Sequence, residues 1–274
     1  MLAFPARSAT IRGVEGVTAA RAYRVLLALL IVAGWFFGLA PFLAPKQFAD
    51  ATGFSGQDIF VYRIAGAATF AYGVGLLLGW RAAWAEMRIP FIATFVFNLC
   101  SIFACLVAIA AGGAQWIVYV ILFASILFTA GTGYFLYRPL NGAPGGGGPA
   151  NLAQWVVALF VIGTAAALFF GAASLILAGA FGKNVGAPGT DDFIYRQAGS
   201  ATMGAAIGGV AVLMARRWES ARLPTVMSLV FNALSVVAAI LQIGTNATTI
   251  SWVILVAAGL VTVGSALALY RRGL

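Results

Sequence analysis

The sequence contains no histidine and few charged residues of either sign. Without histidine, the chain lacks the commonest ligand of haem iron, the usual neutral metal ligand and the side chain that most readily transfers protons near neutral pH. Only 8% of its 274 residues are charged, whereas soluble domains carry roughly 25%. A soluble fold of this size would need more polar side chains to cover its surface. The shortage therefore favours a protein whose apolar side chains face lipid.

Cysteine is scarce as well, and motifs of catalysis are missing. Cys100 and Cys105 are five residues apart in a predicted helix, which turns them about 140° apart. We interpret them as small packing residues, because they diverge too far for a disulfide or a shared metal. No nucleotide-binding, zinc or nucleophile motif is evident. The sequence therefore predicts no metal, no cofactor and no catalytic residue.

Long apolar runs, in contrast, are abundant. The chain is 62% hydrophobic, with a mean hydropathy of +1.00. A helix needs about 20 residues to cross the hydrocarbon core of a bilayer. Runs of about this length lie at 24–44, 62–80, 89–111, 116–137, 153–180, 195–214, 223–244 and 249–270. We predict an all-α polytopic membrane protein with eight transmembrane helices.

The two halves of the chain resemble each other. The segment from Asp58 to Thr69 matches the segment from Asp191 to Thr202 at a spacing of 133 residues. Further identities follow at 134 residues, among them the pairs Trp84 and Trp218, Arg88 and Arg222, Pro90 and Pro224, and Asn98 and Asn232. Such self-similarity predicts an internal duplication. Each copy would cross the membrane four times, so both would enter from one side as parallel repeats.

A run rich in glycine and proline separates the halves and predicts a linker over 141–150. We expect a basic N-terminal arm over 1–23, a first four-helix repeat over 24–140 and a second over 151–274. The first apolar run follows basic residues, as in a signal peptide. It also aligns with the internal run at 153–180, so we expect it to be retained.

The distribution of basic residues predicts the orientation. The chain has 16 lysines and arginines and a net charge of +9. Of these, 12 fall in the segments on the side of the two termini and four in the alternate segments. Short cytoplasmic loops carry such an excess. We predict a multi-pass protein of a bacterial inner (plasma) membrane with both termini cytoplasmic, and no nucleic-acid partner.

The duplicated Asp-x-x-x-Tyr-Arg element is the most distinctive candidate site, at the external end of the second and sixth predicted helices. It supplies the candidate ligand-binding residues Asp58, Tyr62, Arg63, Asp191, Tyr195 and Arg196. In a structural interpretation, each aspartate caps its helix, each tyrosine anchors at the interface, and each arginine snorkels or pairs with the aspartate. In a functional interpretation, the two arginines meet across the pseudo-twofold axis and bind an anionic headgroup, carboxylate or quinone-type oxygen. Contact with another subunit is a third interpretation.

Asn98 and Asn232 form a second candidate pair. Each follows by eight residues a proline that we expect to open its helix, which places it near mid-bilayer. One interpretation is hydrogen bonding between helices at the repeat interface, and the other is a polar lining for a small cavity. Small residues at spacings of four, Ala65, Thr69 and Gly73, predict that the second helix and its counterpart lie at the centre of the bundle.

The Tyr-Arg-x-Ala-Gly-x-Ala-Thr element within a four-helix unit resembles the DoxX-like group of small bacterial membrane proteins. Members of that group are four-helix bundles, and some associate with quinone-linked oxidoreductases. The resemblance implies a tandem duplicate of such a unit, acting as a scaffold or accessory subunit beside a lipid or quinone. It supplies no catalytic residue.

Three functional hypotheses remain. The first is a non-catalytic scaffold or accessory subunit that holds a lipid or quinone-like ligand and contacts other subunits of a membrane complex. The second is a transporter or channel for a small neutral or anionic solute, lined by the two arginines and the two asparagines. The third is a membrane enzyme that uses Asp58, Asp191 or the tyrosines.

Overall fold

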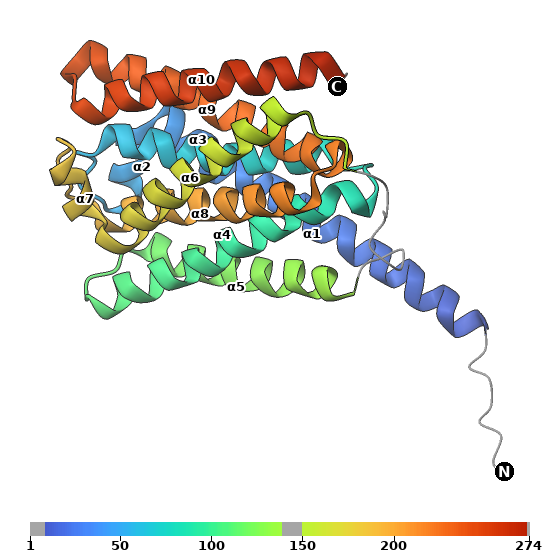
Figure 1. Ribbon diagram of the computed structural model, residues 1–274. Helices are drawn as coiled ribbons and strands as arrows, with labels where there is room; N and C mark the ends of the chain where they lie inside the picture. Colours follow the sequence, from blue (N-terminus) through green and yellow to red (C-terminus); the bar gives the residue numbers. More distant parts are fainter. Residues whose placement is uncertain (1–8, 139–149, 273–274) are drawn as a thin grey trace.

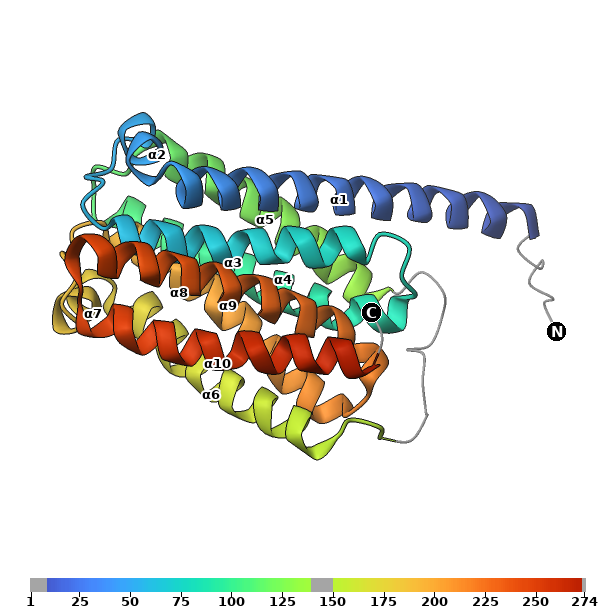
Figure 2. The ribbon, with the colours of Figure 1, turned by 90° about the horizontal axis from the view of Figure 1, so that it is seen from above.

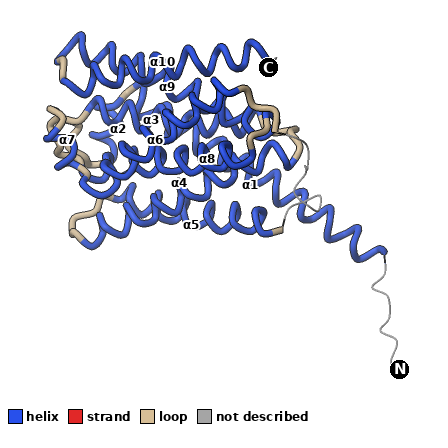
Figure 3. Tube along the Cα trace, in the orientation of Figure 1, coloured by secondary structure: helices blue, strands red, loops and turns tan. Residues whose placement is uncertain are grey.

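The chain is described from a computed structural model over residues 9–138 and 150–272, with side chains over 18–138 and 150–271. Within these ranges it forms ten helices and no strand (Figure 3). Residues 1–8 of the predicted arm and most of the predicted linker lie outside the described residues. The predicted all-α class is confirmed.

Eight of the helices contain a stretch long and apolar enough to cross a membrane. They lie side by side along one common direction (Figures 1 and 2). Their bounds are Ala9–Leu43 (α1), Ile59–Leu78 (α3), Trp84–Ala110 (α4), Trp116–Tyr137 (α5), Gln154–Leu177 (α6), Asp192–Ala215 (α8), Trp218–Asn246 (α9) and Thr249–Arg272 (α10). Each corresponds to one predicted span, so the prediction of a polytopic membrane protein is confirmed.

Two short helices were not predicted, because they are too short to register as spans. They are α2, Pro45–Thr52, and α7, Gly179–Asn184. Both lie at one end of the bundle, which we call the α2/α7 end (Figure 2). α2 begins with a proline, whose missing N–H group is not needed in a first helical turn.

Three helices begin five or more residues before their apolar runs. α4 and α9 start at Trp84 and Trp218, so Pro90 and Pro224 lie inside their helices instead of opening them. Polar first turns, each with a glutamate, extend these helices beyond their apolar runs. α1 starts at Ala9, so much of the predicted arm is helical and projects from the bundle (Figure 2).

Glycines allow the first two long helices of each half to pack closely. A Cβ atom at Gly66 of α3 would lie 2.5 Å from the carbonyl oxygen of Gly38 on α1. At the corresponding position in α8, a Cβ at Gly199 would lie 2.8 Å from the carbonyl oxygen of Gly171 on α6. Only glycine permits backbones to approach so closely. α1 therefore pairs with α3, and α6 with α8.

The two halves interleave. α4 packs most closely on α8 of the other half, and α9 packs extensively on α3 as well as on its neighbour α10, whereas α3 and α4 make few contacts with each other. Gly204 of α8 lies against Ala93 of α4, and Gly75 of α3 against Met227 of α9. Small residues bring α3 and α8 against the opposite half, so the two predicted repeats do not pack as separate bundles. As predicted, these two helices are central: 61% and 56% of their spans are buried, the largest shares among the described spans.

Candidate functional site

Two buried aspartates at the α2/α7 end bind the loop of the opposite half. Asp58 directly precedes α3, and Asp191 directly precedes α8. The Asp58 carboxylate accepts the backbone N–H groups of Gly189 at 2.8 Å, of Thr190 at 2.7 Å and of Asp191 at 2.9 Å. The Asp191 carboxylate accepts those of Ser55 at 2.9 Å and Gly56 at 3.1 Å. Neither aspartate side chain caps its own helix, so that structural interpretation does not hold.

The two tyrosines complete this arrangement. The Tyr62 hydroxyl donates to Asp191, and the Tyr195 hydroxyl donates to Asp58, both at 2.9 Å. Both side chains are buried instead of anchoring at a surface. The four residues form a reciprocal cluster, which we call the carboxylate lock. Because the bonds run between halves, both Tyr-Arg segments lie at the same end of the bundle.

Two glycines shape the loops that enter the lock. Gly56 has φ +66° and Gly189 has φ +64°, a left-handed conformation that glycine adopts without steric cost. This conformation directs their N–H groups toward the opposite carboxylate. They are 133 residues apart, as are Gly53 and Gly186. The sequence match described above begins at Asp58 and does not include these glycines. The Gly-x-x-Gly pattern shared by the two loops is the sequence signal that could have identified them.

The lock holds an ionised carboxylate. Burial raises the pKa of Asp58, but hydrogen bonds from Asp191, Thr190 and Gly189 lower it by more. The net result is a pKa below the ordinary value for aspartate. Hydrogen bonds to a charged acceptor are stronger than those between neutral groups. The lock therefore contributes to holding the halves together near neutral pH.

The two candidate arginines have different surroundings. Arg196 pairs with Asp192 four residues earlier in α8, at 3.3 Å. The position before Arg63 that corresponds to Asp192 holds Ile59. The Nε atom of Arg63 is buried and has no hydrogen-bond partner among the described residues.

The structure does not bring the two arginines together around a cavity. Ala68 of α3 packs with Ala201 of α8 where the halves meet. Arg63 is five residues from Ala68, which turns it about 140° away from that contact. Neither Arg63 nor Arg196 lines either of the cavities described next. The ligand role predicted for them stays a prediction.

Each half contains a cavity. The first-half cavity, about 100 Å³, lies between the pair α1–α3 and the pair α4–α5 and is closed by α8. The second-half cavity, about 250 Å³, lies between the pair α6–α8 and the pair α9–α10 and is closed by α3. Tyr62 and Asn98 line the first, and their counterparts Tyr195 and Asn232 line the second. Tyr72 lines both.

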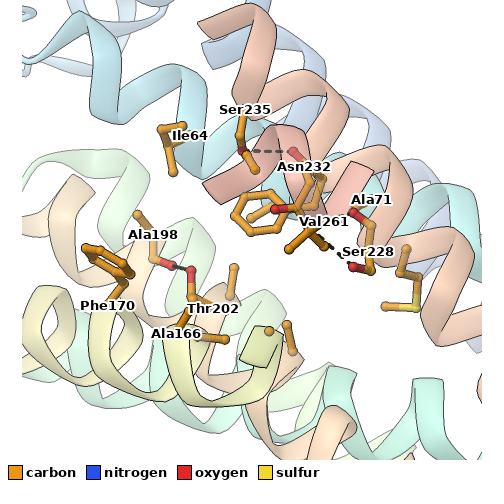
Figure 4. A pocket seen from close by; sticks show the side chains of 18 of the residues that line it. Ile64, Ala71, Ala166, Phe170, Ala198, Thr202, Ser228, Asn232, Ser235 and Val261 are labelled. Atoms are coloured by element: carbon orange, nitrogen blue, oxygen red, sulfur yellow. Dashed lines mark hydrogen bonds between the residues drawn. The ribbon is translucent and has the colours of Figure 1, made fainter. Parts of the chain in front are cut away.

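The asparagines line these cavities and do not join helices. Asn98 donates to the carbonyl of Thr94, and Asn232 to that of Ser228, each at 2.8 Å within its own helix. The interpretation as bonding between helices therefore does not hold. Figure 4 shows Asn232 and Ser235 on one side of the second-half cavity, with Ala166 and Phe170 across from them.

Small residues make the second-half cavity the larger one. At corresponding positions the first-half cavity has larger side chains, as in the pairs Leu30 and Gly163, Leu76 and Gly209, Tyr72 and Ala205, and Phe128 and Val261. A Cβ atom at Gly163 would meet no atom within 4 Å. Along α10 the lining runs from Ile250 to Ser265, about 22 Å at 1.5 Å per residue. Ala257, in the middle of that stretch, is exposed.

Comparisons with known proteins supply no assignment. No protein-family model, no curated protein and no solved structure matches the chain. The lock and the cavities are thus the features from which a function has to be inferred.

The second-half cavity is uncharged. Among the described residues, its only titratable lining residues are Tyr72 and Tyr195, whose hydroxyls donate to the Ala201 carbonyl and to Asp58. Thr202 and Ser235 donate to carbonyls of their own helices at 2.8 Å. Over the described part of the chain, no group of three potential metal ligands occurs. The cavity suits an apolar molecule better than an ion.

Proposed function

We propose that this integral membrane protein is a non-catalytic scaffold or accessory subunit whose second-half cavity holds an uncharged hydrophobic molecule. The observation that carries the proposal is the cavity itself. Its volume is about 250 Å³, and mainly apolar side chains line it. In the first half, Leu30, Leu76 and Phe128 fill much of the corresponding space. Ligand sites are commonly apolar cavities with a few polar groups.

The shape and lining favour a lipid tail or a quinone-like molecule. A length of about 22 Å along α10 fits an extended hydrocarbon chain better than a compact solute. The carboxamide of Asn232, beside Ser228 and Ser235, offers hydrogen bonds to one carbonyl or hydroxyl group of the ligand. Such a ligand would reach the cavity from the bilayer beside Ala257, an exposed residue of the lining.

The proposed orientation places the α2/α7 end outside a bacterial plasma membrane and both termini in the cytoplasm. It is supported by the 12 basic residues on the side of the termini, against four on the other. We also propose that the halves are a tandem duplicate, similar to a DoxX-like unit. The positional correspondence of the two cavity linings supports this.

The test fills the second-half cavity with the residues that the first half uses. The variant combines Gly163→Leu with Val261→Phe, since Leu30 and Phe128 stand at these positions in the other cavity. The matched control combines Gly259→Leu with Val263→Phe on α10. A Cβ at Gly259 meets nothing within 4 Å, and Val263 is 59% exposed.

Native mass spectrometry of protein extracted with its native membrane is the readout. We expect the wild type and the control to retain a hydrophobic molecule, and the filled variant to lose it while eluting as folded protein. Equal retention by the filled variant, or a wild type that carries no such molecule, would refute the proposal.

A further inference from the structure

Buried polar side chains line the first-half cavity, and some of their hydrogen-bonding groups are unused. Thr94, Ser125 and Asn98 line it and are 2%, 3% and 6% exposed. The Thr94 hydroxyl is buried and has no hydrogen-bond partner in the part of the chain that the structure describes. Over the described residues, no hydrogen bond is formed by the Ser125 hydroxyl or accepted by the Asn98 carboxamide oxygen, whose nitrogen donates to the Thr94 carbonyl. The buried Thr94 hydroxyl is unusual in this respect, because buried polar groups are nearly always hydrogen-bonded.

A fourth polar group approaches from the other half. The Gln197 carboxamide lines the cavity from α8, and its oxygen accepts from Ser101 at 2.9 Å. Its nitrogen makes only a long contact, 3.9 Å, to the sulfur of Cys105. Donors and acceptors from α4, α5 and α8 thus converge on one small space.

This polar set is not a general property of the two cavities. In the second-half cavity, Ala258 replaces Ser125 and Ile64 replaces Gln197. Ser228, which replaces Thr94, has a partner there, because its hydroxyl contacts the Asn232 carboxamide at 3.4 Å. The first-half cavity therefore has its own chemistry, separate from that of the proposed hydrophobic site.

We propose that the first-half cavity is a binding site for a small uncharged solute that both donates and accepts hydrogen bonds, such as a short primary amide or a polyol. A volume of about 100 Å³ equals that of about three molecules of liquid water, which fits a solute of a few non-hydrogen atoms. No charged side chain of the described residues lines the cavity, so an ion would lack a counter-charge. The open hydroxyls and the Asn98 oxygen match the donors and acceptors of such a solute.

Saturation-transfer NMR with acetamide and with glycerol, on purified full-length protein in deuterated detergent, tests this site. Ser125→Ala removes one hydroxyl, and alanine is already present at the corresponding Ala258, so the change is compatible with folding. Asn98→Leu fills the cavity and removes the acceptor. Asn232→Leu makes the same change in the second-half cavity and is the matched control.

We expect saturable transfer to at least one probe in the wild type and in Asn232→Leu. Binding should weaken about tenfold in Ser125→Ala, the effect of one lost hydrogen bond, and disappear in Asn98→Leu. No saturable transfer in the wild type would mean that the cavity holds water only and would overturn the proposal. Unchanged affinity in Ser125→Ala would do the same, even if Asn98→Leu did not fold. Either result leaves the second-half cavity and its hydrophobic ligand untouched, because neither Ser125 nor Asn98 lines that cavity.

Discussion

The carboxylate lock makes a quantitative prediction about which residues are energetically coupled. Asp58 lies four residues before Tyr62, a spacing that on a helix would suggest contact between them. In the structure, however, Asp58 accepts its tyrosine hydrogen bond from Tyr195 of the other half, at 2.9 Å. A double-mutant cycle separates these alternatives, because it measures the interaction between two side chains directly.

The cycle combines Asp58→Asn with Tyr195→Phe. Removing the Tyr195 hydroxyl deletes one hydrogen bond to a charged acceptor, so it should lower the free energy of unfolding by about 1.5–3 kcal/mol. Asp58→Asn should cost more, because the charged acceptor of five hydrogen bonds is lost. We expect a coupling energy of about 1–2 kcal/mol, within the range measured for residues in direct contact.

The control cycle combines Asp58→Asn with Tyr62→Phe, the pair that shares a helix. Here we expect a smaller coupling than in the cross-half cycle, because Tyr62 donates to Asp191 and is linked to Asp58 only through that residue. Both cycles can be measured by unfolding the purified protein with SDS in mixed micelles. A coupling in the same-helix cycle equal to or larger than that in the cross-half cycle would refute the reciprocal geometry.

Two further predictions concern pH and helix packing. The free energy of unfolding should fall as the pH drops below about 4, because the lowered pKa of Asp58 stabilises the fold only while the carboxylate is ionised. Asp58→Asn should flatten this decline in a pH series. An unchanged slope in the variant would contradict the role of Asp58. Gly199→Ala should destabilise by about 2 kcal/mol or more, because its Cβ would lie 2.5 Å from the backbone nitrogen of Leu175. Gly163→Ala, with open space around its Cβ, should be neutral or stabilising by up to about 1 kcal/mol in the same assay. Equal effects of the two alanines would count against the close approach of α6 and α8.

The spans could be predicted from the sequence because hydrophobicity over about 20 residues is a local property. The central position of α3 was also readable, since Ala65, Thr69 and Gly73 mark a face that permits close approach. The start of α4 was not predicted, because its polar first turn extends the helix before Pro90 without adding to the apolar run.

The site was predicted in part. The sequence singled out both aspartates and both tyrosines, but a spacing of four describes only neighbours on one helix. Tertiary packing decides which half a side chain contacts, so the hydrogen bonds of Tyr62 and Tyr195 to the opposite half could not be predicted from the sequence. The sequence does show Leu30 at the position that corresponds to Gly163. This substitution indicates a difference in cavity volume only once both positions are known to face a cavity.

The interleaving of α4 with α8 and of α9 with α3 has a consequence for how the protein can change. In a symmetric homodimer of a four-span subunit, one gene would encode both chambers, so every substitution would alter both at once. Here each chamber is encoded separately, while the opposite half supplies one of its walls. One chamber can therefore widen for a hydrophobic ligand while the other stays narrow and polar, and neither chamber is complete until helices of both halves have been inserted.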